Sequence, residues 1–403
     1  MHGRYLAKTG ACNLMWNRQF ISLCLILLAA GLVTAPIELL FPVYVEDALG
    51  KTVWFAALLR AIPIALGGLF ALVGGALSDR LGRKSTLILG MTGALVVGVV
   101  FISKQPLLIW GVLCYQGIAS GFRIAGGQSY LISAVDANRL GLAAAVYFLT
   151  YTFGGSVGSA IGGELIDRFN YGVVGSGAIF VMILLILVAL ILLPRLPHGG
   201  DRRTSFTQML VGYREMLRRR EVRLLLGMRF LPTYYWGTVS LLLPVLIART
   251  AGVRLAGYYG ASRDLFAACC QLISGRICDA AGAKSTAFVA TCLVALSAVL
   301  ITLNTDSTPL LFALGVFSAG AAWSVSITMP RLIDEFFATE EKGRGVGITH
   351  LAWSSGFLSG HMVGGRLESV NISLPFAVAS GMVVISAILA FRLWQSGKVK
   401  RDA

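Results

Sequence analysis

The chain has 403 residues, of which 56% are hydrophobic and only 13% are charged, and its mean hydropathy is +0.77. Soluble domains carry roughly 25% charged residues, so a soluble protein of this length could not cover its surface with so few. The composition therefore indicates a membrane protein. A net charge of +15 would also suit a nucleic-acid-binding protein, but no soluble stretch is long enough to form a basic domain, and no nucleic-acid partner is expected.

Apolar runs that match the roughly 20 residues of a bilayer-spanning helix follow one another in two groups of six. The third and ninth runs are somewhat shorter than the others. The pattern predicts an all-α membrane protein with twelve transmembrane helices in two parallel six-helix repeats. In chain order the runs cover about residues 20–45, 53–77, 86–103, 107–132, 141–164 and 172–193, then 224–248, 254–277, 286–303, 309–332, 346–367 and 372–394.

A polar, basic stretch separates the two groups of runs. We therefore predict an N-terminal six-helix bundle over residues 1–193, a basic linker over 194–223 and a C-terminal bundle over 224–403. The second part of the linker, from Tyr213 to Arg220, is typical of a short amphipathic helix at a membrane surface.

The positions of Lys and Arg predict the orientation. With the N-terminus in the cytoplasm, 24 of the 34 basic residues fall on the cytoplasmic side, six outside and four within helices. Cytoplasmic loops of membrane proteins carry this excess, so both termini and the linker are expected in the cytoplasm. The expected location is a bacterial inner (plasma) membrane.

Nothing in the sequence points to a metal, a cofactor or an enzyme. The seven cysteines are scattered, mostly inside apolar runs, and show neither a zinc spacing nor a disulfide framework. The four histidines are dispersed, and no Ser–His–Asp set is suggested. We therefore expect no metal site, no cofactor and no catalytic residue.

The chain repeats itself at an offset of about 200 residues. Residues 75–86 and 275–286 agree at six of twelve positions, and both follow the second helix of their half. A second similarity, at an offset of 202, lies in the fifth helix of each half. The matching pairs there are Gly154/Gly356, Gly158/Gly360, Gly162/Gly364 and Gly163/Gly365.

The first copy of the loop motif reads Gly75-x-x-x-Asp79-Arg80-x-Gly82-Arg83-Lys84, which resembles the 2–3 loop signature of the major facilitator superfamily. That resemblance implies a transporter fold with a substrate site between the halves. It also implies that the loop is a conformational latch, formed by the residues of the motif together with Asp279 of the second copy. The second copy has Ala280 and Ala283 in place of the two arginines, so its latch is expected to be weaker.

The glycines Gly154, Gly158, Gly162, Gly356, Gly360 and Gly364 place small residues four apart, which permits close helix packing. The segment around Gly158 also resembles the helix-5 signature of drug–proton antiporters. Ser159 stands where that signature has Pro, however, and Leu113 stands where the helix-4 signature has Arg. Packing and antiport both remain possible roles for the glycines.

Ionisable residues inside apolar runs cost at least about 2.5–3.5 kcal/mol each on insertion, so each is a candidate for function. Glu38 lies between two prolines, and burial favours the protonated form of a carboxyl group. Glu38 is either a proton carrier or one partner of a permanent ion pair with Arg60 or Arg123. The side chains of the neighbours Arg263 and Asp264 should point about 100° apart and are not expected to pair.

These residues give two sets of candidates. The proton-coupling candidates are Glu38, Asp264 and His361. The substrate-binding candidates are the arginines Arg60, Arg123 and Arg263 with the mid-helix aromatics Tyr130, Tyr147, Tyr151, Tyr235, Trp236, Trp323 and Trp353. Arg229 lies nearer a helix end, where it can reach the membrane surface.

The sequence thus favours a secondary active transporter, in which proton-coupled efflux moves a small organic or amphipathic molecule by alternating access. The alternatives are an importer or facilitator of an anionic metabolite, and a lipid-handling carrier. The expected partners are a small-molecule substrate, protons and membrane lipid, and the chain is expected to act as a monomer.

Overall fold

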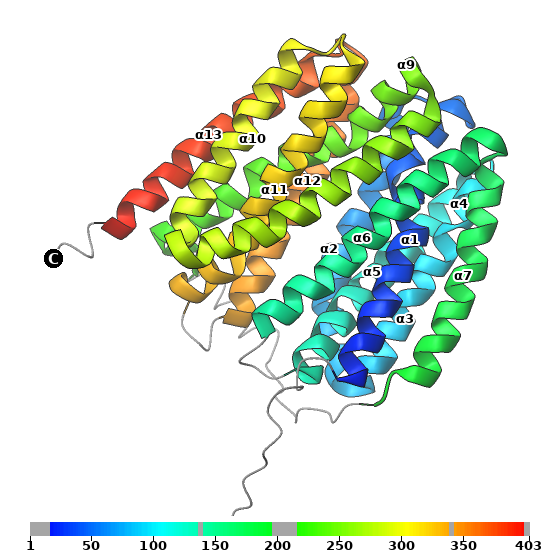
Figure 1. The fold of residues 1–403 in the computed structure, drawn as a ribbon, viewed down its shortest axis with the longest axis horizontal. Helices are drawn as coiled ribbons and strands as arrows, with labels where there is room; N and C mark the ends of the chain where they lie inside the picture. The colour runs from blue at the N-terminus through cyan, green and yellow to red at the C-terminus, as the bar shows by residue number, and fades with distance from the viewer. Residues whose placement is uncertain (1–16, 136–139, 196–215, 338–341, 399–403) are drawn as a thin grey trace, which may run out of the picture.

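The computed structural model describes residues 17–135, 140–195, 216–337 and 342–398 (Figure 1). Over these residues the chain is almost entirely helical and has no strand. The first half holds α1 (Arg18–Asp47), α2 (Val53–Leu81), α3 (Arg83–Val97), α4 (Val99–Ile102), α5 (Pro106–Ala134), α6 (Leu140–Arg168) and α7 (Tyr171–Leu192). The second half holds α9 (Arg220–Ala281), α10 (Ala283–Leu303), α11 (Thr308–Phe336), α12 (Lys342–Glu368) and α13 (Leu374–Lys398).

Helix covers all twelve predicted spans, and the predicted all-α membrane fold is confirmed. Two predicted spans join in α9, which turns at Gly252 (φ 82°), and α3 and α4 together fill one span. Among the described residues, nine helices are long and apolar enough to cross a membrane. Helices α6 and α12 occupy two further predicted spans, where the glycine ladders and polar side chains lower the hydropathy.

The predicted linker over 194–223 lies between α7 and α9 and includes the first residues of α9. Helix α7 ends at Leu192 and α9 begins at Arg220, so residues 220–223 are helical rather than part of the connection. The first three residues of the predicted amphipathic helix, 213–215, lie outside the described part of the chain, while residues 216–218 are helical.

The helices pack into two bundles (Figure 1). In the first, α1 packs against α6 and α7, while α2 and α3 pack against α5. In the second, α9 packs against α11, α12 and α13, while α10 packs against α11 and α13. The bundles meet where α6 contacts α9 and where α2 contacts α12.

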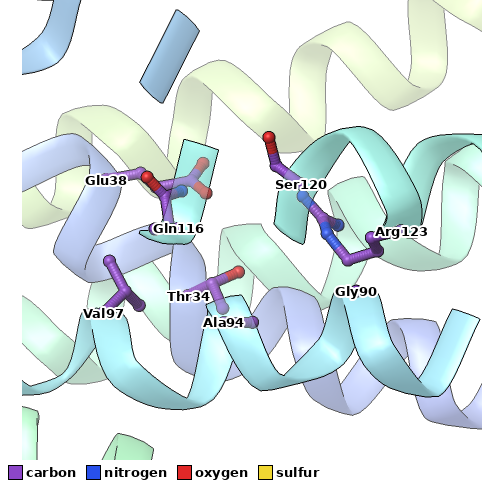
Figure 2. Close-up of a pocket in the computed structure, with 8 residues that line it drawn as sticks. All are labelled: Thr34, Glu38, Gly90, Ala94, Val97, Gln116, Ser120 and Arg123. Carbon is purple, nitrogen blue, oxygen red and sulfur yellow. The ribbon is translucent and has the colours of Figure 1, made fainter. Parts of the chain in front are cut away.

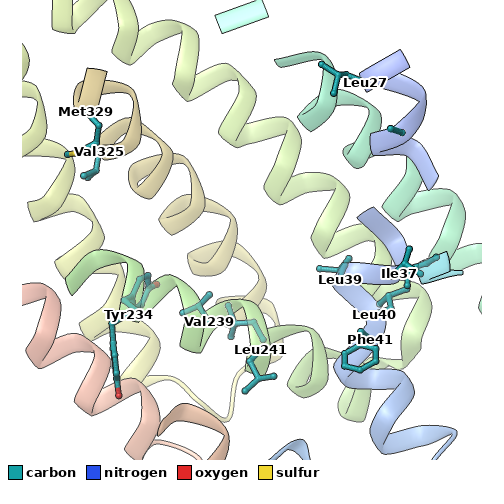
Figure 3. Close-up of a cluster of buried hydrophobic side chains, with 14 of the residues drawn as sticks. Leu27, Ile37, Leu39, Leu40, Phe41, Tyr234, Val239, Leu241, Val325 and Met329 are labelled. Carbon is teal, nitrogen blue, oxygen red and sulfur yellow. The ribbon is translucent and has the colours of Figure 1, made fainter. Parts of the chain in front are cut away.

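Buried hydrophobic side chains fill both bundles, and Figure 3 shows part of this core on α1, α9 and α11. On α1 the side chains of Leu27, Ile37 and Leu40 are almost completely buried. Helix α1 is therefore covered by neighbours on most sides, which lets it carry polar residues that face the protein interior rather than lipid.

The glycine ladders bring the fifth helix of each half against the first. A Cβ atom on Gly158 would overlap the carbonyl oxygen of Leu32 in α1, and one on Gly360 would overlap that of Tyr234 in α9. Any larger residue at these two positions would force the helices apart. The two halves thus use the same close approach, as expected for repeated units.

The glycines Gly82 and Gly282 are repeated because of backbone conformation rather than helix packing. They have φ values of 89° and 88°, and each directly precedes a helix, α3 or α10. This left-handed backbone is unfavourable for residues with a Cβ atom. The repeat of glycine in the loop motif therefore reflects the same tight turn in both halves.

Two ends of the molecule are named here for use below. The linker face is the end where α7 finishes and α9 begins. The distal face is the opposite end, with the α1–α2 and α6–α7 connections and the turn at Gly252.

Candidate functional site

The N-terminal bundle contains a small cavity of about 10 Å³, room for about one water molecule, between α1, α3 and α5 (Figure 2). Polar and charged side chains from α1 and α5 line it, and small residues of α3 leave the space open. The lining residues are Thr34, Glu38, Gly90, Ala94, Val97, Gln116, Ser120 and Arg123. We call this cavity the polar chamber.

Helical spacing explains how these residues come together. Thr34 and Glu38 are four apart on α1, so they lie on one face. On α5, Gln116, Ser120 and Arg123 follow the same rule, at spacings of four and three. The matching face of α3 presents small residues at positions 90 and 94, and a Cβ atom on Gly90 would overlap the Arg123 backbone, so this glycine lets α5 approach α3 closely.

Proline determines how Arg60 is held. Pro42 has no backbone N–H, so the Glu38 carbonyl four residues earlier lacks its usual helical donor. The Arg60 guanidinium supplies that donor, with Nη1 2.8 Å from the Glu38 carbonyl oxygen. Arg60 is thus bound to the backbone of α1.

The Glu38 carboxylate has no ion-pair partner in the part of the chain that the structure describes. It lies close enough to Arg60, Arg123 and Arg263 to act on all three electrostatically. The permanent ion pair considered from the sequence is therefore not formed in this conformation.

Arg123 lies beside two tyrosines of α6. Its guanidinium carbon is 5.8 Å from the centre of the Tyr151 ring, a distance at which a cation is attracted to the ring face. The Tyr151 hydroxyl lies 3.2 Å from the Thr34 hydroxyl. Tyr147 lies one turn earlier on α6, and its hydroxyl approaches Gly127. Tyr147 and Tyr151 of α6 thus help to position the Arg123 guanidinium.

One prediction about the C-terminal bundle is wrong. Arg263 and Asp264 were not expected to pair, yet Arg263 Nε donates to Asp264 Oδ1 at 2.8 Å. Their side chains are 14% and 11% exposed. The Cα–Cβ directions of the two residues lie about 100° apart, but the arginine side chain is long enough to fold back and reach the carboxylate. The low dielectric of the protein interior strengthens the attraction between the two charges. The Arg263 guanidinium also lies 5.6 Å from the centre of the Trp236 ring.

Most other aromatic candidates lie away from the chamber. The Tyr130 hydroxyl donates to the Pro194 carbonyl at 3.1 Å, near the linker face. Tyr235 is fully buried in the C-terminal bundle, and Trp323 of α11 is partly exposed. Trp353 stacks between His350 and Phe357, at centroid distances of 5.5 and 5.2 Å.

His350, Trp353, Phe357 and His361 form a row of rings along α12, and His361 is its last member. Its ring centre is 4.5 Å from that of Phe357, and Nδ1 lies 3.1 Å from the Phe357 carbonyl oxygen. The side chain is completely buried. The His350–His361 row was not recognised in the sequence, although its spacing of three and four residues was visible there.

The structure describes only part of the predicted latch. The side chains of Asp79, Arg80 and Asp279, and the packing around Gly75, lie outside the described residues. For the rest, the partly exposed Arg83 and Lys84 begin α3 after Gly82, and the Lys84 ammonium donates to the Leu190 carbonyl at 2.6 Å.

The equivalent lysine in the second half has a different partner. Lys284 pairs with Glu335 of α11 at 2.5 Å and lies 5.0 Å from the centre of the Phe336 ring. The matching lysines therefore anchor different helices in the two halves.

Ion pairs join the bundles at the distal face. Arg249 of α9 bonds across the bundles to Glu46 of α1 at 3.0 Å, and within its own bundle to Glu368 of α12 at 2.7 Å. Arg254 lies 3.9 Å from Glu164 of α6. We call these contacts the distal ion pairs.

Close helix packing lies beneath the distal ion pairs. A Cβ atom on Gly163 of α6 would be 2.9 Å from Cα of Gly257 in α9. Ser156 Oγ donates to the Ala261 carbonyl at 2.8 Å. The two bundles are thus held together over the distal part of α6 and α9.

A search of the described residues finds no group of three or more His, Cys, Asp or Glu side chains that could hold a metal ion. The candidate site combines one carboxylate, one guanidinium, amide and hydroxyl groups, and an apolar surround.

The Major Facilitator Superfamily model matches residues 20–263 and 225–402 of this sequence, which together cover nearly the whole chain. This chain belongs to the Major Facilitator Superfamily. The family and its fold are those of transporters, so the sequence-based interpretation as a membrane transporter is confirmed at that level.

Individual relatives are more distant. A stretch of 132 residues is 32% identical to "Multidrug efflux pump LfrA" of Mycolicibacterium smegmatis (strain ATCC 700084 / mc(2)155). This match covers 32% of the chain and 25% of the pump, so most of the pump's length is not matched.

Two solved structures share the major facilitator fold. A POT family transporter in complex with 5-aminolevulinic acid superposes with a TM-score of 0.79 at 13% identity, over 94% of this chain and 96% of that one. A POT family transporter in complex with a thioalcohol-conjugated peptide gives 0.77 at 14% identity, over 93% and 95%. At these identities the likeness concerns the fold alone.

Proposed function

We propose that this transporter is a proton-coupled exporter of small organic or amphipathic molecules that works by alternating access. The observation that carries the proposal is the polar chamber, in which Glu38 lies beside open space without a direct ion-pair partner in the described structure. The partial similarity to a multidrug efflux pump supports the direction of transport.

Glu38 is the proposed proton carrier because its surroundings differ from those of the other candidates. Asp264 is held by Arg263 at 2.8 Å, and protonating it would break that pair. His361 is completely enclosed by protein. A proton that crosses 100 mV releases about 2.3 kcal/mol, which sustains a roughly 40-fold gradient.

The basic linker face is proposed to lie in the cytoplasm, since loops on that side carry most of the Lys and Arg. The distal face then faces outward. In this conformation the Arg249–Glu46 and Arg254–Glu164 pairs and the packing of α6 on α9 hold the outer ends of the bundles together. Export would require these contacts to separate and those on the linker face to form.

The direct test is flux in proteoliposomes that contain a lumenal pH dye, with a panel of organic cations, anions and neutral amphiphiles. Wild-type protein is expected to move protons opposite to a substrate. Glu38→Gln is expected to abolish that proton movement, because the amide cannot release a proton. Glu335→Gln is the matched control, since Glu335 lies outside the chamber and pairs with Lys284.

A Glu38→Gln protein with unchanged proton-driven flux would overturn the proposed role of Glu38. Proton flux that is equally impaired in the Glu335→Gln control would instead show a general loss of folded protein. Comparing the amount of monodisperse protein recovered for each variant separates these outcomes.

A second candidate function is uptake of an anionic metabolite. It is favoured by Arg123, whose guanidinium lines the chamber. In that case proton and substrate move in the same direction, and Arg123→Ala abolishes uptake while Glu38→Gln does not. The direction of the pH change in the same flux experiment decides between the two candidates.

A further inference from the structure

His361 lies on the side of α12 that faces α2 of the other bundle. Four positions later, a Cβ atom on Gly365 would be 2.7 Å from Cβ of Ala57 in α2. Seven positions earlier, the Ser354 hydroxyl lies 3.3 Å from where a Cβ atom on Gly68 of α2 would be. Residues at these spacings share one face of a helix. The imidazole, which is completely buried, is therefore enclosed between the two bundles.

The hydrogen bonding of the His361 ring shows where a proton can bind. Nδ1 lies 3.1 Å from the Phe357 carbonyl oxygen, and because a carbonyl only accepts, Nδ1 carries the hydrogen of this bond. Nε2 of the neutral ring then presents a lone pair, and it has no hydrogen-bond partner among the described residues. A buried acceptor without a donor is unfavourable and uncommon in folded proteins. Nε2 is thus the atom at which the ring can accept a proton.

Arg60 makes the closed interface unfavourable for a charged ring. Its guanidinium comes from α2 and acts electrostatically on His361, while its Nη1 atom is held by the Glu38 carbonyl at 2.8 Å. On the α9 side, the Tyr234 carbonyl oxygen packs against the adjacent Gly360. No carboxylate of the described residues acts on the ring. A protonated imidazole would therefore meet a like charge and low dielectric without a counter-ion.

We propose that Nε2 of His361 is a proton-binding site that becomes accessible only when α2 and α12 separate at the distal face. In the closed conformation the ring is neutral. When the distal face opens, Arg60 moves away with α2, water reaches the ring, and Nε2 takes up a proton. The protonated ring then opposes closure until the proton leaves. The inference rests on the proposed function only in that the distal face opens during transport, and the site is separate from Glu38.

The population open at the distal face should rise in acid. A proton that binds the open conformation and not the closed one shifts the equilibrium towards the open one as the pH falls. An imidazole in water is half protonated at about pH 6.5. Lowering the pH from about 8 to about 5.5 should therefore raise the ratio of open to closed molecules by up to about tenfold.

Spin labels at Lys51→Cys and Val370→Cys, next to the distal ends of α2 and α12, measure this separation in lipid nanodiscs. Both positions are exposed, and the labelled protein lacks its seven native cysteines. The longer distance should gain population in acid, and His361→Gln should remove this change because the amide takes up no proton. His350→Gln is the matched control, since His350 belongs to the same row of rings but lies about three turns away, where Arg229 acts on it.

A second measurement needs no substitution at His361. The C2 hydrogen of an imidazole exchanges with deuterium from water, and mass spectrometry measures this exchange at each histidine. If water reaches the ring only in the open conformation, the exchange rate follows the open population. Arg249→Gln breaks the Arg249–Glu46 pair between the bundles, so it should speed exchange at His361 by about 1.4- to fivefold. Exchange at His350 in the same molecules is the internal control and should not rise.

A distance change in acid that survives His361→Gln would overturn the inference, as would its equal loss in His350→Gln. Exchange at His361 that does not respond to Arg249→Gln would also overturn it.

Glu38→Gln separates this inference from the proposed function. The distance change should persist in that variant, and its loss there would assign the pH response to Glu38 instead. A change that needs His361 in a protein that moves no protons overturns only the proposed function. Proton-driven flux without a change that depends on His361 overturns only this inference.

Discussion

In the N-terminal bundle, Glu38 and Arg123 border open space, whereas in the C-terminal bundle Arg263 and Asp264 bond to each other at 2.8 Å. The two bundles are repeats with the same helix order and the same glycine contacts. Arg60 and Arg263 even lie at similar depths in the second helix of each half. One of them, however, binds a carbonyl freed by proline, and the other binds a carboxylate.

The difference shows what buried charge is used for in each half. A charge with a fixed partner in a region of low dielectric stabilises one arrangement, and removing the partner is costly. A charge that borders a cavity keeps its capacity to bind a proton or a ligand. We therefore propose that the N-terminal bundle carries the proton and substrate chemistry, while the C-terminal bundle is the more rigid partner.

The largest effect expected from this comparison concerns Asp264→Asn. Removing the carboxylate leaves the Arg263 guanidinium buried without its partner, and breaking such a pair costs roughly 3–5 kcal/mol. Thermal unfolding in detergent, followed by size-exclusion chromatography, should show a strongly destabilised protein. The double variant Arg263→Met/Asp264→Leu should recover most of the lost stability.

Arg123→Gln serves as the comparison in the other bundle, because it removes no ion pair of the described structure and should leave the unfolding temperature nearly unchanged. If Asp264→Asn were as stable as the wild type but lost proton movement, the comparison would fail. Asp264 would then be a proton carrier rather than a structural partner.

A smaller effect is expected from the glycine ladders, which differ at their distal ends. A Cβ atom on Gly162 would overlap the ring of Pro36, whereas one on Gly364 would lie 3.1 Å from Thr238 Cγ2. Gly162→Ala should therefore destabilise by about 1–3 kcal/mol. In Gly364→Ala the mild contact is offset by the better helix propensity of alanine, worth about 1 kcal/mol.

The measurement is again thermal unfolding of the two purified variants beside the wild type. Equal destabilisation by both substitutions would contradict the asymmetry between the ladders. A greater loss of stability in Gly364→Ala than in Gly162→Ala would reverse the asymmetry. The C-terminal bundle would then be the more tightly packed one at this level.

Much of this architecture could be predicted from the sequence because it depends on local patterns. Apolar run lengths gave all twelve helical segments, and the spacing of the glycines indicated the close contacts of α6 and α12. Glu38 and Arg123 stood out because ionisable residues are rare in apolar runs. Each of these signals is contained in a short stretch of chain.

The rest depended on how helices rotate and tilt against one another. Thr34 and Gln116 are ordinary polar residues in the sequence, and only the packing of α1, α3 and α5 makes them line a chamber with Glu38. The pairing of Arg249 with Glu46 joins residues 203 apart. The Arg263–Asp264 pair was missed because side-chain reach was judged from backbone direction alone.

The smallest expected effect concerns the distal ion pairs, of which Arg249–Glu46 joins the two bundles and Arg249–Glu368 lies within the C-terminal bundle. Arg249→Gln removes the bonds to Glu46 and Glu368. The Arg249 side chain is 36% exposed, so each pair contributes only about 0.2–1 kcal/mol. Because only the Arg249–Glu46 pair crosses between the bundles, the population open at the distal face should rise by about 1.4- to fivefold.

Spin labels at Lys51→Cys and Asp306→Cys, one in each bundle at the distal face, would report this shift as a longer distance between the labels, in a protein without its seven native cysteines. Arg168→Gln is the control, since Arg168 pairs with Glu164 within α6 and links no bundles. High salt should shift the wild type in the same direction, because partly exposed pairs are screened. If Arg249→Gln and Arg168→Gln gave the same distances, the bundles would be held together by the packing of α6 on α9 alone, and charge would play no part in closing the distal face.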